Sequence, residues 1–193
     1  MTLLLPEGIA GRAPRRITVA EYLADIEADR FHPDSRAELI DGLIVERTPI
    51  GTAHSYATRT LRLLLTHRLT DTYVVGSQEP ILLPPDSRPE PDLWLAAPPS
   101  GQYGRRDPEP ADLALVVEVA DSSFEFDYGK KRPLYAVAEI REYWIVDLQH
   151  RRLIVSTEPD GLGAYAKTSE YDDTETLHHD RFGAVSVAVF VAD

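Results

Sequence analysis

Hydrophobic residues form one long run and several short runs along the chain. The prediction of the fold starts from the longest run. Leu113–Val119 is apolar except for Glu118, and Tyr143–Val146 forms a second apolar run. Runs of this kind are typical of strands that are covered on both faces. The segment between them has helical character and carries Lys130 and Lys131. The stretch therefore predicts strand, helix, strand, with a carboxylate on the first strand and lysines near the start of the helix.

Helical periodicity appears at two further places. The capping-box pattern TVAE at 18–21 predicts a helix over about 19–29. Apolar residues at helical spacing predict an amphipathic helix over about 54–69. In the central helix, Pro133 is tolerable only in the first turn, so we expect that helix to begin near 130–132.

Short strands account for most of the remaining pattern. Asp41-Gly42 between two apolar runs predicts a hairpin over 38–46. The other strand candidates are 73–83 (one strand or two), 91–96, 153–156, 164–168 and 185–191, and the Pro/Gly-rich segment 97–110 is expected to be a surface loop. The prediction is an α+β fold: a mixed central sheet flanked by two or three helices, with β-hairpins added at each end. We expect residues 1–16 to be a flexible N-terminal lead and 17–193 to be a single domain.

Composition narrows the class of protein. The chain has 193 residues, 43% of them hydrophobic and 27% charged, which is ordinary for a globular protein. No apolar run approaches the roughly 18 residues that span a bilayer, and no signal peptide is recognisable, so a cytoplasmic location is expected. Without cysteine there are no disulfides or thiolate metal sites. The net charge of −12 argues against broad attraction to nucleic acid, although it leaves room for a local basic strip.

Four residues together suggest chemistry: Glu38, Asp92, Glu118 and Lys131. Asp92 and Glu118 lie on separate predicted strands, and if these strands pair, both carboxylates can project at one edge and share a divalent cation. Magnesium prefers oxygen ligands and keeps several waters, so two carboxylates and a backbone carbonyl suffice. Such an ion polarises a phosphodiester and helps to deprotonate an attacking water. A nearby ammonium group adds positive charge at the phosphate.

Several spaced motifs resemble those of one known family. They are ELIDG (38–42), PEPDL (89–93), VVEVADSS (116–123), DYGKK (127–131) and EYWIVD (142–147). In this order they resemble the Uma-two family of restriction-endonuclease-like proteins, within the PD-(D/E)XK nuclease superfamily. The resemblance covers roughly residues 18–157. It implies a restriction-endonuclease-like core and a hydrolase that cuts DNA with magnesium or manganese.

The resemblance also implies roles for individual residues. Asp92 and Glu118 would bind the metal, Glu38 would assist the metal or the water, and Lys131 would stabilise developing charge. In the superfamily the lysine normally stands two residues after the second acid, where this chain has Ala120. Lys131 from the following helix is the matching residue here. It can reach the site only if the intervening turn folds the start of the helix back over the end of the strand.

Each of these residues also has a purely structural interpretation. Asp92 could cap a turn, Glu118 could form a structural salt bridge, Glu38 could be a solvated hairpin residue and Lys131 an exposed helix residue. Further candidates lie outside this set, each open to a plainer role. His54 and Gln78 could contact water or phosphate as secondary site residues. Tyr135 is expected in the core or behind the site, and Trp144 is expected in the core. His178 and His179 should face opposite sides of a strand, so they are not expected to share a site.

Two functions of different kinds remain open. The first is a magnesium-dependent endonuclease with DNA as substrate, bound weakly because of the acidic net charge, and acting as a homodimer by analogy. The second is a catalytically inactive or regulatory member that keeps the fold as a binding or dimerisation module. The acidity of the chain and the absence of lysine at position 120 support the second. Cleavage of RNA instead of DNA cannot be separated from the first by sequence.

Overall fold

The computed structural model describes residues 2–3, 15–31, 37–47, 49–69 and 71–191. The chain divides into two compact units, one formed by Met1–Pro49 with Pro80–Glu90 and the other by Ile50–Glu79 with Pro91–Asp193. The single domain expected over 17–193 therefore stays a prediction. Most of the expected N-terminal lead, residues 1 and 4–14, lies outside the described residues.

The first unit combines one helix with a small sheet. Helix α1 (Val19–Glu27) begins at Thr18, whose side chain forms the expected capping box with Glu21. Strands β2 (Ala37–Ile40) and β3 (Leu43–Glu46) form the predicted hairpin, and β1 (Thr2–Leu3) pairs with β3. Asp41 and Gly42 both have positive φ, at 51° and 73°, which is the conformation of a two-residue type I′ turn.

The second unit is built on a six-stranded sheet in the order β4-β5-β6-β7-β8-β9. Its strands are β4 (Val74–Gly76), β5 (Leu93–Ala96), β6 (Leu113–Ala120), β7 (Glu142–Asp147), β8 (Arg152–Pro159) and β9 (Tyr165–Asp172). Only β6 and β7 are parallel, and the helical segment that connects them makes the crossover. The sheet is therefore mixed, as predicted.

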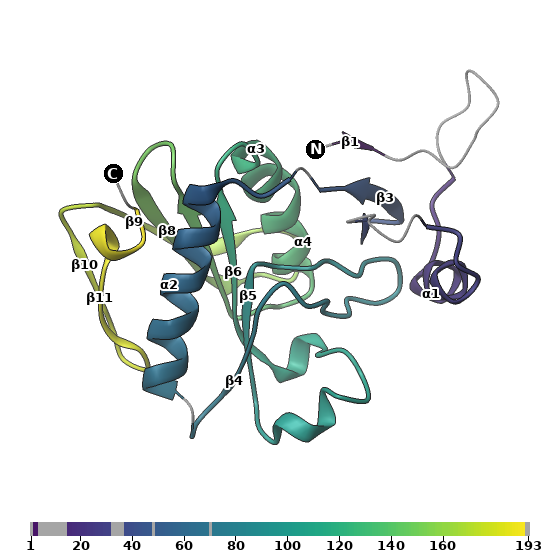
Figure 1. Cartoon of the computed structure of the whole chain (residues 1–193), viewed down its shortest axis with the longest axis horizontal. Helices are drawn as coiled ribbons and strands as arrows, with labels where there is room; N and C mark the ends of the chain where they lie inside the picture. Colours follow the sequence, from purple (N-terminus) through teal and green to yellow (C-terminus); the bar gives the residue numbers. More distant parts are fainter. Residues whose placement is uncertain (1, 4–14, 32–36, 48, 70, 192–193) are drawn as a thin grey trace. The chain divides into compact units, whose positions relative to one another are not determined.

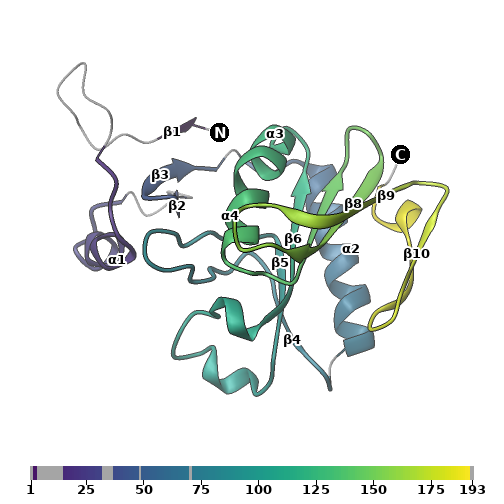
Figure 2. The same cartoon turned by 180° about the vertical axis from the view of Figure 1, so that it is seen from behind.

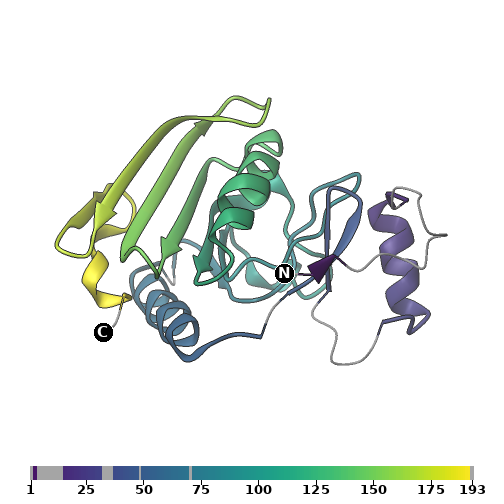
Figure 3. The same cartoon turned by 90° about the horizontal axis from the view of Figure 1, so that it is seen from above.

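Helices cover both faces of this sheet. Helix α2 (Thr52–Leu69) lies on one face and α4 (Arg132–Val137) on the other, in front of and behind the sheet in Figure 1 and reversed in Figure 2. The view along the sheet in Figure 3 shows the strands between them. On the α2 face, Leu61 and Leu65 pack in one cluster with Val117 of β6, all of them fully buried. Since every residue of β6 is buried, its near-continuous apolar sequence is explained by cover on both faces.

The crossover and the C-terminal segment differ from the prediction. The helical segment begins earlier than residue 130, with α3 (Phe124–Phe126) and a π-helical turn, η3 (Asp127–Lys131), before α4. Pro133 lies in the first turn of α4, as its missing N–H requires. The strand expected at 185–191 was wrong beyond its first residues: β11 is Gly183–Ser186, and a 3₁₀ turn follows at Val187–Val189.

Local chemistry explains these differences. Val187 and Phe190 are both buried and three residues apart, which is the spacing of a 3₁₀ turn, whereas a short apolar run is ambiguous in sequence. Only Val74–Gly76 of the segment 73–83 is a strand, and the extended conformation is interrupted at Gln78, whose φ is 55°. Strand β10 (Thr176–His179) pairs with β11; the sequence places His178 and His179 on a strand but does not predict its bounds.

Candidate functional site

Asp92 and Glu118 occupy opposed positions on neighbouring strands. Strand β5 pairs antiparallel with β6 so that Leu93 is opposite Val117, and Asp92 and Glu118 are the next residues along this register. Asp92 directly precedes β5, and its carboxylate accepts a hydrogen bond from the backbone N–H of Val119, the residue after Glu118. Both side chains are buried, with 1% and 2% of their surface exposed. Two acids 26 positions apart in sequence therefore come together in the interior, as the sequence predicts for paired strands.

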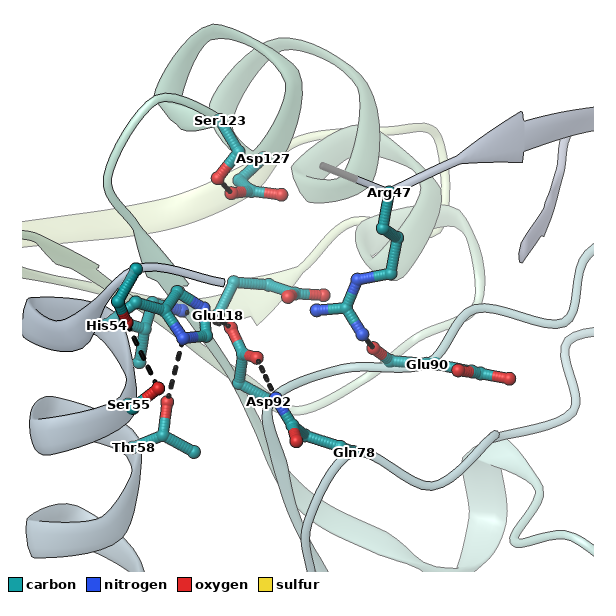
Figure 4. Close-up of polar contacts among 12 residues, drawn as sticks. Arg47, His54, Ser55, Thr58, Gln78, Glu90, Asp92, Glu118, Ser123 and Asp127 are labelled. Carbon is teal, nitrogen blue, oxygen red and sulfur yellow. Dashed lines mark hydrogen bonds and ion pairs between the residues drawn. The ribbon is translucent and has the colours of Figure 1, made fainter. Parts of the chain in front are cut away.

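Three donors hold the carboxylate of Asp92 (Figure 4). Oδ2 accepts a hydrogen bond from the backbone N–H of Val119 at 2.8 Å and lies 3.0 Å from Nε2 of His54. The side-chain amide of Gln78 is 3.5 Å from Oδ1. On its other side the His54 ring meets the hydroxyl of Thr58, with 3.4 Å between Nδ1 and Oγ1. These contacts orient the carboxylate and satisfy a buried charge.

Glu118 is held by side chains of the crossover segment. Its Oε1 accepts hydrogen bonds from Nζ of Lys131 and from the hydroxyl of Tyr135, each at 2.9 Å. Lys131 is buried, with 2% of its surface exposed, whereas its neighbour Lys130 is exposed. The structure thus brings Lys131 and not Lys130 to the acid, and the start of the helix does fold back over the strand end.

The π-helical turn determines which way Lys131 points. The backbone N–H of Arg132 donates to the carbonyl of Asp127, five residues earlier, instead of four as in an α-helix. Asp127 is itself buried and accepts a hydrogen bond from Ser123 Oγ at 2.6 Å. The wider turn carries one extra residue and changes the direction of every side chain that follows. Lys131 and Tyr135 consequently both reach Glu118.

The buried hydroxyl of Tyr143 lies near two of these carboxylates. The pKa of the Tyr143 hydroxyl is raised well above its usual value, first because the group is fully buried and then because the Asp127 and Glu118 carboxylates lie near it. The same hydroxyl donates to the backbone carbonyl of Asp127 at 3.2 Å. Tyr143 therefore stays protonated and acts as a donor.

Glu38, the remaining predicted site residue, contacts Arg47 and Glu90 of the first unit. It is 1% exposed, and its Oε1 lies 3.0 Å from Nε of Arg47. Arg47 also donates to the carbonyl of Glu90 at 2.8 Å, which Figure 4 shows, and the N–H of Glu90 is 3.4 Å from Glu38 Oε2. Glu38 is thus not the solvated hairpin residue that its plainer interpretation required. Its part in any chemistry stays a prediction.

Sequence reasoning did not select Asp127, Arg47 or the Val119 N–H, although each lies in or beside these networks. Asp127 stands four positions before Lys131 within a segment that packs on the sheet, and a buried acid at helical spacing from a buried lysine is a usable signal. Every residue except proline has a backbone N–H, so the sequence does not indicate which N–H contacts a carboxylate. Two of the remaining candidates contact Glu142 instead of the site acids: Trp144 donates to its carboxylate at 2.6 Å, and His179 lies 3.1 Å from the same carboxylate.

The oxygen donors of Asp92 and Glu118 suit a hard divalent cation. Magnesium keeps several of its waters and needs only one or two protein carboxylates. Among the described residues, no three His, Asp or Glu side chains form a group that could hold a metal by themselves. The carboxylate oxygens of Asp92 and Glu118 therefore fit a hard divalent cation.

The fold matches that of a solved nuclease-like protein. A crystal structure from Anabaena variabilis ATCC 29413, titled as a "putative nuclease belonging to DUF820", superimposes with a TM-score of 0.69 at 13% sequence identity, covering 91% of this chain and 97% of that one. The class is therefore a nuclease-fold α+β protein. The sequence profile of the Uma2 family, described as "Putative restriction endonuclease", matches residues 19–189. The chain belongs to this family, which confirms the resemblance. No curated protein matches it.

Proposed function

We propose that this protein is a metal-dependent endonuclease that hydrolyses phosphodiester bonds in DNA. The observation that carries the proposal is the opposition of Asp92 and Glu118 across β5 and β6, with the ammonium of Lys131 2.9 Å from Glu118 Oε1. An acid pair with an adjacent lysine is the donor set that phosphoryl chemistry uses. Family membership supports the same activity.

Asp92 and Glu118 would hold the cation, magnesium or manganese. When bound, this ion would supply charge neutralisation at the phosphate and a more acidic water. His54, Gln78 and the Val119 N–H hold the Asp92 carboxylate in one orientation, so His54 and Gln78 are positioning residues in this proposal.

Lys131 and Tyr135 act on the second acid. Both donate to Oε1 of Glu118 and keep it ionised and oriented. The Lys131 ammonium also places a fixed positive charge beside the acids, where negative charge develops on a phosphate undergoing attack. Because this group is buried and donates to Glu118, its position is fixed before a substrate binds.

Supercoiled plasmid cleavage with and without magnesium tests the proposal. We expect nicked and linear products only with the metal, and a rate loss of at least about 100-fold in Glu118→Gln and in Lys131→Ala. Lys130→Ala is the matched control because that lysine is exposed, and it should cleave like the wild type. Activity that survives both site substitutions would refute the assignment.

A thermal-shift measurement separates this proposal from an inactive binding module. Magnesium should raise the melting temperature of the wild type, since a ligand that binds only the folded state stabilises it, and Asp92→Asn should abolish the rise. No shift, together with no cleavage of DNA or RNA, would favour the module. Cutting both strands of a duplex calls for two sites, which supports a homodimer, and sedimentation equilibrium tests that state.

A further inference from the structure

We infer that the exposed side of α2 binds the sugar-phosphate backbone of the nucleic acid that reaches the site, an inference that rests on the proposed function. The helix is unusual in this acidic chain. Its 18 residues, TAHSYATRTLRLLLTHRL, include three arginines and two histidines but no aspartate or glutamate. The whole protein has a net charge of −12, so this helix is a local basic strip of the kind that its composition leaves open.

Four polar residues of α2 line up along one side of the helix. Ser55, Arg59, Arg62 and Thr66 are separated by four, three and four positions, which at 100° per residue places them within about 60° of one another. Arg59, Arg62, Ser55 and Thr66 are all exposed. We call this set the α2 stripe. From first to last it extends about 16 Å, the axial length of roughly five nucleotides of B-form strand.

The arginines of the α2 stripe are not committed to carboxylates of the protein. Over the described parts of the chain, neither Arg59 nor Arg62 forms an ion pair with Asp or Glu, and the Arg59 guanidinium lies over the Tyr56 ring, 5.8 Å from the ring centroid. Several other exposed arginines do pair with a carboxylate, for example Arg106 with Asp112 at 2.6 Å. Exposed guanidinium groups without a carboxylate partner are well suited to phosphate oxygens, which they bind in bidentate fashion.

The α2 stripe starts next to the candidate site. Ser55 directly follows His54, whose ring contacts Asp92, and Figure 4 shows both side chains in the first turns of α2. A phosphodiester strand running along the stripe would therefore pass beside the residue that contacts Asp92. The mostly polar and cationic character of the stripe favours a phosphate backbone over an apolar partner. The direct continuity with Asp92 favours the substrate over a second, acidic copy of this chain.

Fluorescence anisotropy with a labelled 20-base-pair duplex tests the inference. The assay is run in EDTA over a series of salt concentrations, with wild type, Arg59→Ala/Arg62→Ala and the control Arg105→Ala/Arg141→Ala. The control arginines are also exposed and removed in the same number, and alanine is well tolerated in a helix. We expect the α2 variant to lose at least about 10-fold in affinity at low salt. The slope of log K against log salt should fall by about 1.8, or 0.9 for each lost phosphate contact.

Equal affinity and equal slopes in the two double variants would overturn the inference. Sedimentation of the same samples tests whether a second copy of this chain binds the α2 stripe instead. A wild-type dimer that becomes monomeric only in Arg59→Ala/Arg62→Ala would assign the stripe to self-association and would also overturn the inference. Binding in EDTA does not depend on cleavage. A protein that binds through the stripe but never cuts DNA would keep this inference and lose the proposed function, and an active nuclease with unchanged affinity would do the reverse.

Discussion

Replacing Lys131 with methionine should destabilise the protein strongly, because the change leaves a buried carboxylate without its cation. Lys131 and Glu118 are joined by a 2.9 Å contact, and their side chains are 3% and 2% exposed. Removing one partner of such a pair costs about 3–5 kcal/mol. Since the Tyr135 hydroxyl still donates to Glu118, we expect the lower end, about 3 kcal/mol. For a chain of 193 residues this corresponds to a fall in melting temperature of about 6–12 °C.

The double variant Glu118→Gln/Lys131→Met gives the decisive comparison. It removes both charges, so its free energy of unfolding should lie within about 1 kcal/mol of the wild-type value. Urea unfolding followed by tryptophan fluorescence measures both effects, since Trp94 and Trp144 are buried. Lys130→Met, at an exposed neighbour, should change stability by less than about 0.5 kcal/mol. A loss below about 1 kcal/mol in Lys131→Met, or a double variant as unstable as the single one, would refute the buried ion pair.

Two further predictions concern packing and pH. Gly76→Ala should lower the free energy of unfolding by about 3 kcal/mol, because the new Cβ would lie 1.9 Å from Trp94 Cε2. Gly129→Ala has no atom within 4 Å of its new Cβ and should raise the free energy of unfolding by about 0.5–1 kcal/mol. Thermal denaturation that gives the same sign for both changes would contradict this prediction. Burial raises the pKa of Tyr22 to about 12, and its hydroxyl donates to the Ala37 carbonyl at 2.7 Å. Because the folded-state pKa is raised above 10.0, this stabilisation is complete below pH 10 and is lost between pH 10 and 12. The phenolate absorbance of the wild type minus that of Tyr22→Phe should titrate near pH 12, and a midpoint near pH 10 would disprove the burial effect.

The sequence predicted the parts of the fold that depend on local pattern. The capping box before α1, the Asp41-Gly42 turn and the apolar run of β6 each have one favoured structure, so their elements were confirmed. The segments 73–83 and 185–191 failed because prolines and short apolar runs do not fix a single conformation. Strand β10 carries only one fully buried residue, Leu177, and offers too little alternation for its bounds to be predicted.

The candidate site could also be predicted from the sequence only in part. Convergence of Asp92 and Glu118 follows from strand pairing, which the buried runs around them suggest. The contact between Lys131 and Glu118 depends on η3, and no local residue preference announces a π-helical turn. The Val119 N–H contact depends on tertiary structure alone. Sequence therefore identified which side chains matter more readily than how the backbone orients them.

The π-helical turn makes this part of the chain sensitive to length as well as to identity. Deleting one residue between Phe124 and Lys131 would let the segment close as an ordinary α-helix and swing the lysine by about 100° around the axis, away from Glu118. An insertion would do the opposite with the same result. Anyone who transplants the acid–lysine arrangement onto another scaffold must therefore carry over the widened five-residue winding, because the correct amino acids on a regular helix would point elsewhere.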